Sequence, residues 1–188
     1  MTGRTLVAGV GNVFLHDDAF GVEVARLLAE RPRQDGVEIA DFGIRGVHLV
    51  YELLDGCDLF VLIDAAQHGF QPGTVTVVQP GPADATLGPP VMDGHGLTPD
   101  GIFAMLASLG GHPGRTLLVA CEPADVSPGI GLSEPVQAAL PHAIRAVEEI
   151  LGTPGHKEGA HAAQANPANS GGAHSDGDRR RDTGAAGH

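Results

Sequence analysis

Five carboxylates follow closely on the apolar, strand-like segments of this sequence. Asp17 and Asp18 come after the glycine turn that ends the first segment, Asp41 and Asp64 end the second and third, and Glu122 ends the last. In an open α/β sheet, ligands bind beyond the carboxyl ends of the parallel strands, which is where these side chains would meet. Carboxylates gathered at one edge repel each other, so a fold that keeps them is expected to neutralise them with a cation.

Each of these acids also has a structural interpretation. Asp17 or Asp18 could cap the first helix, where carboxylates accept hydrogen bonds from free N–H groups. Asp41 could bond the turn backbone of "DFGIRG", and Glu122 could simply end its strand. Asp64 is harder to explain in this way, because it follows the buried run "LFVLI" and an unpaired carboxylate is costly there. It is therefore the strongest candidate for a chemical role.

A histidine in a loop completes the set of candidate ligands. His95 lies in "PPVMDGHGLTPDG", shortly before a predicted helix that begins with Thr98 as its N-cap. A lone histidine in a loop is more often a plain surface residue. Together with two carboxylates, however, an imidazole forms a mixed oxygen and nitrogen set that suits nickel or zinc and leaves coordination positions open.

The elements that must position these residues alternate between strand and helix. Five strand-like segments are predicted, at residues 4–10, 36–42, 58–65, 73–80 and 115–123. Helical patterns fill the intervals: an apolar stripe from Asp18 to Pro32, residues 47–54, a segment capped by Thr98, and a segment from Ser133 to Leu151. This order predicts an α/β three-layer sandwich with a mostly parallel sheet and helices on both faces. The fourth strand is predicted to be antiparallel at an edge, because too few residues precede it for a parallel crossover.

Composition separates a folded part from a tail. Residues 1–151 are predicted to form one domain, whereas residues 152–188 are rich in Gly, Ala and His, contain almost no large apolar side chain and are predicted to be disordered. The formal net charge of −12 arises entirely from the first part, since the charges of the tail cancel. Such a charge should repel polyanions such as nucleic acid and makes a metal cation or a basic protein the more natural partner. Taken alone, the charge has a simpler interpretation, which is solubility.

Several features bear on where the protein works. No apolar run approaches the ~20 residues of a membrane span. The sequence "MTGRTLVAGVGN" enters a strand pattern at once, without the features of a secretory signal. Cys57 and Cys121 stand outside any CxxC pair, as expected for small core residues in a reducing compartment. We therefore expect no contact with a membrane and a cytoplasmic location.

A nucleotide-binding oxidoreductase is a rival interpretation of the segment "GVGNVFLHDDAFGV". It would need a third glycine where Phe14 stands, and a pyrophosphate would be repelled by Asp17 and Asp18. Asp41 could bind a ribose, but the other two features oppose this interpretation.

The motifs taken together resemble the hydrogenase maturation endopeptidases, which trim the C-terminus of the [NiFe]-hydrogenase large-subunit precursor after nickel insertion. The resemblance rests on "GVGN" with "DDAFGVEV", "DFGIRG", "LIDA", "HGLTP" and "PGIGLSEPVQAALPHAI", which are spread over nearly all of residues 1–151. It implies that Asp18, Asp64 and His95 are the metal-recognising residues. It also implies that the nickel is presented by the precursor, so that no tightly bound cofactor of the protein's own is expected.

The chemistry of cleavage is left open by the sequence. No serine or cysteine stands in a nucleophile-with-base setting, which favours attack by water, with the metal polarising the carbonyl group or lowering the pKa of the water. Asp18 or Asp64 could act as general base, and a mechanism that uses only the carboxylate pair, of the aspartic type, is an alternative. A non-catalytic nickel-binding or chaperone module for hydrogenase assembly is the alternative function.

Overall fold

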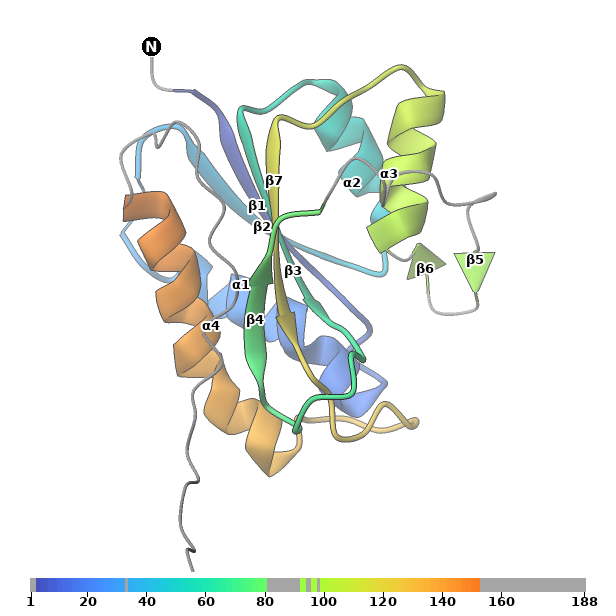
Figure 1. Cartoon of the computed structure of the whole chain (residues 1–188), viewed down its shortest axis with the longest axis vertical. Helices are drawn as coiled ribbons and strands as arrows, with labels where there is room; N and C mark the ends of the chain where they lie inside the picture. Colours follow the sequence, from blue (N-terminus) through green and yellow to red (C-terminus); the bar gives the residue numbers. More distant parts are fainter. Residues whose placement is uncertain (1–2, 33, 81–91, 94–95, 98, 153–188) are drawn as a thin grey trace, which may run out of the picture.

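The computed structural model describes residues 3–32, 34–80, 92–93, 96–97 and 99–152 of the chain (Figure 1). The predictions for His95 and Thr98, and the predicted disorder of residues 153–188, therefore lie outside the described residues. None of the helices in these ranges is long and apolar enough to cross a membrane.

A five-stranded sheet forms the centre of the molecule (Figure 1). Its strands are β1 (Thr5–Val10), β2 (Val37–Gly43), β3 (Leu59–Ala65), β4 (Val75–Val78) and β7 (Arg115–Cys121), in the order β2-β1-β3-β7-β4. The first three and β7 are parallel, and β4 is antiparallel to β7 at the edge. The predicted fold class and the antiparallel edge strand are thus confirmed. The connection from β3 to β4 is too short to return the chain to the other end of the sheet.

Helices cover both faces of this sheet. The helical elements are a 3₁₀ turn, η1 (His16–Ala19), and the α-helices α1 (Phe20–Ala29), α2 (Gly46–Leu54), α3 (Pro99–Ser108) and α4 (Glu134–Gly152). In Figure 1, α1 and α4 lie on one side of the sheet and α2 and α3 on the other. Sequence patterns missed η1, which begins before the predicted helix start, and two short strands, β5 (Met92–Asp93) and β6 (Gly96–Leu97), that pair with each other. The last helix continues through Pro141.

The alternation of side chains along the strands divides the core in two. Val61 and Ile63 of β3 pack with α1 and α4, whereas Phe60 and Leu62 pack with α2 and α3. Because successive side chains of a strand point to opposite faces, Asp64 turns toward the face covered by α2 and α3.

A glycine brings α1 close to the strand ends. A Cβ atom at Gly21, in the first turn of α1, would lie 2.1 Å from the carbonyl oxygen of Ile63 and 2.4 Å from that of Val10. Any larger residue would push the helix away from β1 and β3. This close contact also places η1, which precedes α1, over the carboxyl ends of both strands.

Candidate functional site

Asp64 is a buried carboxyl at the end of β3. Asp64 is 8% exposed, and its Oδ1 atom accepts a hydrogen bond of 2.8 Å from the N–H of Ala65. Its pKa is raised to about 8, chiefly by burial and then by the negative charge of Asp18, while the hydrogen bond from the N–H of Ala65 acts to lower it. Asp64 is therefore held where its ionised form is poorly stabilised by the protein alone.

Asp18 reaches the same place from η1. The glycine turn bends the chain sharply: Gly11 has a φ of 130°, and a Cβ atom there would lie 1.8 Å from the carbonyl oxygen of Asp18. The N–H of Asn12 donates a hydrogen bond of 2.7 Å to Oδ2 of Asp18. The capping interpretation is wrong for Asp18, because neither η1 nor α1 has a side-chain cap. The turn thus brings the Asp18 carboxylate near enough to Asp64 for repulsion.

Asp17 has a different role, which sequence patterns missed. It is fully buried, and its carboxylate accepts hydrogen bonds from the N–H groups of Ala124, Asp125 and Ser133 and from the hydroxyl of Ser133, at 2.7–2.9 Å. Burial acts to raise its pKa, but these hydrogen bonds outweigh burial and hold the pKa below its usual value. Instead of capping a helix, Asp17 ties η1 to the connection between β7 and α4.

The other two acids of the row are also engaged elsewhere. Asp41 lies in an ion pair with Arg26 of α1, at 3.4 Å. Glu122 accepts hydrogen bonds from the N–H groups of His68, at 2.8 Å, and Gly69, at 3.2 Å. The bond from His68 is the main cause that holds the pKa of Glu122 below its usual value. The expected row of five carboxylates therefore reduces to one repelling pair, Asp18 and Asp64.

His95 lies outside the described residues, so the predicted set of three ligands is not tested. β6, which directly follows His95 in the chain, contacts α2 and α3. These helices cover the face of the sheet toward which Asp64 turns. Within the described ranges, no three side chains of His, Cys, Asp or Glu are grouped so as to hold a metal ion. The donors that the structure does bring together are two carboxylates, and a cation is the ligand that relieves their repulsion.

Two connections at this edge of the sheet are joined by a short bridge. Leu15 pairs with Gly129, and His16 adopts a φ of 45°, which is uncommon for a residue with a side chain. Its Nδ1 atom lies 3.0 Å from the carbonyl oxygen of Gly131. A Cβ atom at Gly129 would lie 1.9 Å from Nε2 of His16, so glycine is required there. The glycines of "PGIG" were the available sequence signal for this contact.

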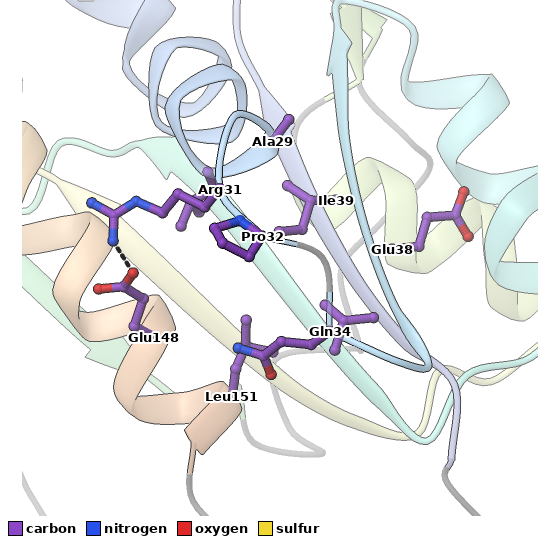
Figure 2. A pocket seen from close by; sticks show the side chains of 10 residues that line it. Ala29, Arg31, Pro32, Gln34, Glu38, Ile39, Glu148 and Leu151 are labelled. Carbon is purple, nitrogen blue, oxygen red and sulfur yellow. Dashed lines mark hydrogen bonds and ion pairs between the residues drawn. The ribbon is translucent and has the colours of Figure 1, made fainter.

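A separate cavity of about 890 Å³ lies at the other end of the sheet (Figure 2). It is bounded by Pro32 after α1, Ile39 on β2 and Leu151 at the end of α4, and an ion pair between Arg31 and Glu148 crosses its margin (Figure 2). Because β2 is parallel to β1 and β3, this cavity lies near the amino ends of the strands and away from Asp64. It does not form part of the carboxylate site.

Comparisons with known proteins identify the family. A family model described as hydrogenase maturation protease matches residues 22–150. The hydrogenase expression/formation protein HoxM of Azotobacter vinelandii is 34% identical over 148 residues, which cover 78% of this chain and 71% of that protein. The hydrogenase 2 maturation protease of Escherichia coli is 30% identical over 149 residues, covering 79% of this chain and 90% of that protein.

Solved structures agree with these sequence relatives. The hydrogenase maturating endopeptidase HybD of E. coli matches with a TM-score of 0.65 at 29% identity, covering 79% of this chain and 91% of that chain. A [NiFe] hydrogenase maturation protease HycI from Thermococcus kodakarensis matches with a TM-score of 0.60 at 26% identity, covering 80% and 93%. The resemblance seen in the sequence is confirmed. This chain belongs to the hydrogenase maturation protease family, a family of endopeptidases that process hydrogenases.

Proposed function

We propose that this endopeptidase removes the C-terminal extension of a [NiFe]-hydrogenase large-subunit precursor after nickel insertion, and that it recognises the bound nickel through Asp18, Asp64 and His95. The observation that carries the proposal is the buried Asp64 carboxyl beside Asp18. Their mutual repulsion is relieved by a proton on Asp64 or by a cation, and a cation that binds both carboxylates displaces that proton. Nickel in this reaction is part of the substrate.

The described residues support particular roles in the reaction. Asp18 is held by the N–H of Asn12 and Asp64 by the N–H of Ala65, so both carboxylates have a defined orientation before the precursor binds. When the precursor binds, its nickel supplies polarisation of the scissile carbonyl group or of an attacking water. As the water attacks the carbonyl carbon, either carboxylate accepts its proton as general base and passes a proton to the amine nitrogen when the peptide C–N bond breaks. The burial of Asp64 keeps bulk water away from this step.

A mechanism of the aspartic type, without participation of the metal in bond cleavage, is the alternative chemistry. The two carboxyl groups have different surroundings, since Asp64 is buried and Asp18 is partly exposed. Paired carboxyl groups in unequal environments can hold one proton between them and divide the roles of acid and base. Replacing nickel in the precursor with a divalent ion of different Lewis acidity distinguishes the two mechanisms. The rate of cleavage should change with the ion only if the metal takes part in bond cleavage.

The decisive experiment is mass spectrometry of the precursor after incubation with the wild-type enzyme and with Asp18→Asn, Asp64→Asn and His95→Asn. We expect cleavage of nickel-loaded precursor by the wild type and at least ~100-fold slower cleavage by each variant. Asp58→Asn and His142→Asn, which change exposed residues away from the site, serve as matched controls and should cleave normally. Full cleavage by all three site variants would reject the assignment.

The non-catalytic nickel module is the less favoured alternative, because the relatives are named as proteases. Truncation after Leu151 separates the two functions. We expect the truncated enzyme to cleave as fast as the full chain, whereas a module that depends on the histidines of residues 152–188 would lose its function.

We further propose that the reaction takes place in the cytoplasm, which is consistent with the free thiols of Cys57 and Cys121.

A further inference from the structure

Two large apolar side chains are exposed beside the carboxylate site. Phe14, in the connection between β1 and η1, is 64% exposed, and Ile130, in the connection between β7 and α4, is 78% exposed. A single exposed apolar residue is ordinary on a protein surface. Here, however, the two connections are hydrogen-bonded to each other, so the two side chains belong to one surface feature.

The backbone that carries these side chains is held in place. The N–H of Phe14 donates to Oδ1 of Asn12 at 3.0 Å, and its carbonyl oxygen accepts from the N–H of Gly129 at 2.8 Å. On the other connection, the carbonyl oxygen of Gly129 accepts from the N–H of His16 at 3.2 Å. The buried carboxylate of Asp17 ties the same two segments together. Apolar groups on a fixed backbone lose little conformational entropy when they are covered, which is the property of a preorganised binding surface.

A groove of about 480 Å³ lies between these side chains. Its walls come from the two connections and from the first halves of α1 and α4. The lining is mostly apolar and includes Val13, Phe14, Ala19, Ile130, Leu132 and Leu140. Glu23 and Arg26, which form an ion pair at 3.1 Å, stand at its polar side. The groove has room for one or two large side chains of a partner.

The position and charge of the groove indicate its occupant. Ala19, which lines the groove on the side of the sheet covered by α1 and α4, directly follows Asp18 in η1, so the groove begins one residue from the carboxylate site. The surrounding edge of the sheet carries the acids Asp18 and Asp125, and the folded part of the chain holds the whole net charge of −12. A partner that fits this surface brings an apolar side chain and positive charge together.

We propose that this groove, lined by Phe14 and Ile130, binds an apolar side chain on a basic segment of the large-subunit precursor, next to the nickel that Asp18 and Asp64 recognise. The inference rests on the proposed function and deepens it by naming a second contact with the same substrate. The groove anchors the polypeptide while the carboxylates contact the metal. Its contribution is uniform binding energy, which changes KM and leaves kcat unchanged.

The test is steady-state cleavage of nickel-loaded precursor by Phe14→Ser and Ile130→Ser. Each substitution should raise KM about tenfold, and the pair together about 30- to 100-fold, while kcat stays within about twofold of the wild type. Leu109→Ser is the matched control, because Leu109 is 50% exposed and lies just beyond the end of α3, away from the groove. Its KM should equal that of the wild type. Thermal melting shows whether each variant folds. If Phe14→Ser is unstable, Ile130→Ser still tests the groove, because Ile130 is the more exposed of the two residues.

Salt dependence tests the charge of the occupant. The wild-type KM should rise several-fold when the ionic strength is raised from about 0.05 M to about 0.5 M, because screening weakens attraction between the acidic edge and a basic segment. A KM that does not change with salt would contradict the basic character of the segment.

The possible failures are distinguishable. If the wild type does not cleave nickel-loaded precursor, the proposed function itself fails. If the wild type cleaves but Phe14→Ser and Ile130→Ser have the KM of Leu109→Ser, the groove proposal alone is overturned. If the wild type forms dimers that both substitutions disrupt without changing KM, the occupant is a second copy of this chain, which also overturns the proposal.

Discussion

Replacing Asp64 with asparagine removes a charge that the folded chain holds away from water. The pKa of this carboxyl is raised from its ordinary value of 3.8 to about 8 in the folded protein, because of burial first and the charge of Asp18 second. The folded protein therefore binds this proton more tightly than the unfolded chain. It follows that stability from this group is fully present below about pH 4 and is lost as pH rises toward 8.

The pKa shift of Asp64 sets the size of this effect on stability. About four pKa units at 1.36 kcal/mol per unit mean that ionisation of Asp64 lowers the free energy of unfolding by on the order of 5 kcal/mol above pH 8, and by about 1.5 kcal/mol near pH 5. A buried amide in place of the carboxyl costs on the order of 1–3 kcal/mol where its N–H groups lack partners. Asp64→Asn should therefore stabilise the protein by roughly 2–4 kcal/mol near pH 8.5 and leave it about unchanged near pH 5.

The assay is urea unfolding of both proteins near pH 5 and near pH 8.5, with a chelator present so that no cation occupies the site. Asp18→Asn should act in the same direction but by less, since burial is the larger cause of the shift. Asp58→Asn, at an exposed position just before β3, should change the free energy of unfolding by less than about 0.5 kcal/mol at either pH. A difference between Asp64→Asn and the wild type that is the same at both pH values would refute the reasoning.

Three further substitutions probe the framework of the site. Asp17→Asn should lower the free energy of unfolding by about 2–4 kcal/mol at pH 7, because the amide turns donors toward the N–H groups of Ser133 and Asp125. Since the pKa of Asp17 is lowered in the folded protein, this loss should shrink as the pH falls below about 4. Chemical unfolding at pH 7 and below pH 4 checks both statements. Gly21→Ala should lower the free energy of unfolding by more than about 2 kcal/mol, because its Cβ would lie 2.1 Å from a carbonyl oxygen. Gly152→Ala is the control, because a Cβ there meets open space, and it should be neutral or slightly stabilising. Equal melting temperatures of the two variants would contradict this prediction. Pro141→Ala should raise the melting temperature by several degrees, because an N–H group is restored inside α4, and an unchanged melting temperature would show that the helix has already adapted.

Much of the fold could be predicted because it depends on local pattern. β1, β3 and β7 are nearly unbroken apolar runs, which is how strands buried on both faces of a parallel sheet are composed. The antiparallel edge strand followed from the short connection that precedes it. A meeting of acids from the first and third strands was also predictable, because parallel strands place their carboxyl ends at one edge, and the family resemblance selected Asp18 and Asp64 among them.

The pattern of strands did not distinguish between the acids at that edge. Asp17 and Asp18 are adjacent and chemically identical, yet one is fully buried and the other faces Asp64. The donors that bind Asp17 lie 107–116 residues away in the chain, so no local signal marks them. The same holds for Glu122, whose partner His68 is 54 residues away.

The sequence by itself therefore determined the alternation of strands and helices along the chain, the direction of the strands, the edge at which their carboxyl ends meet, and the family. The tertiary structure alone decided which carboxylates are held by several backbone N–H groups and which two, Asp18 and Asp64, lie close enough to repel each other. The physical reason is that hydrophobic periodicity is written residue by residue, whereas the pKa of a carboxyl depends on burial and on neighbours that only folding brings within reach.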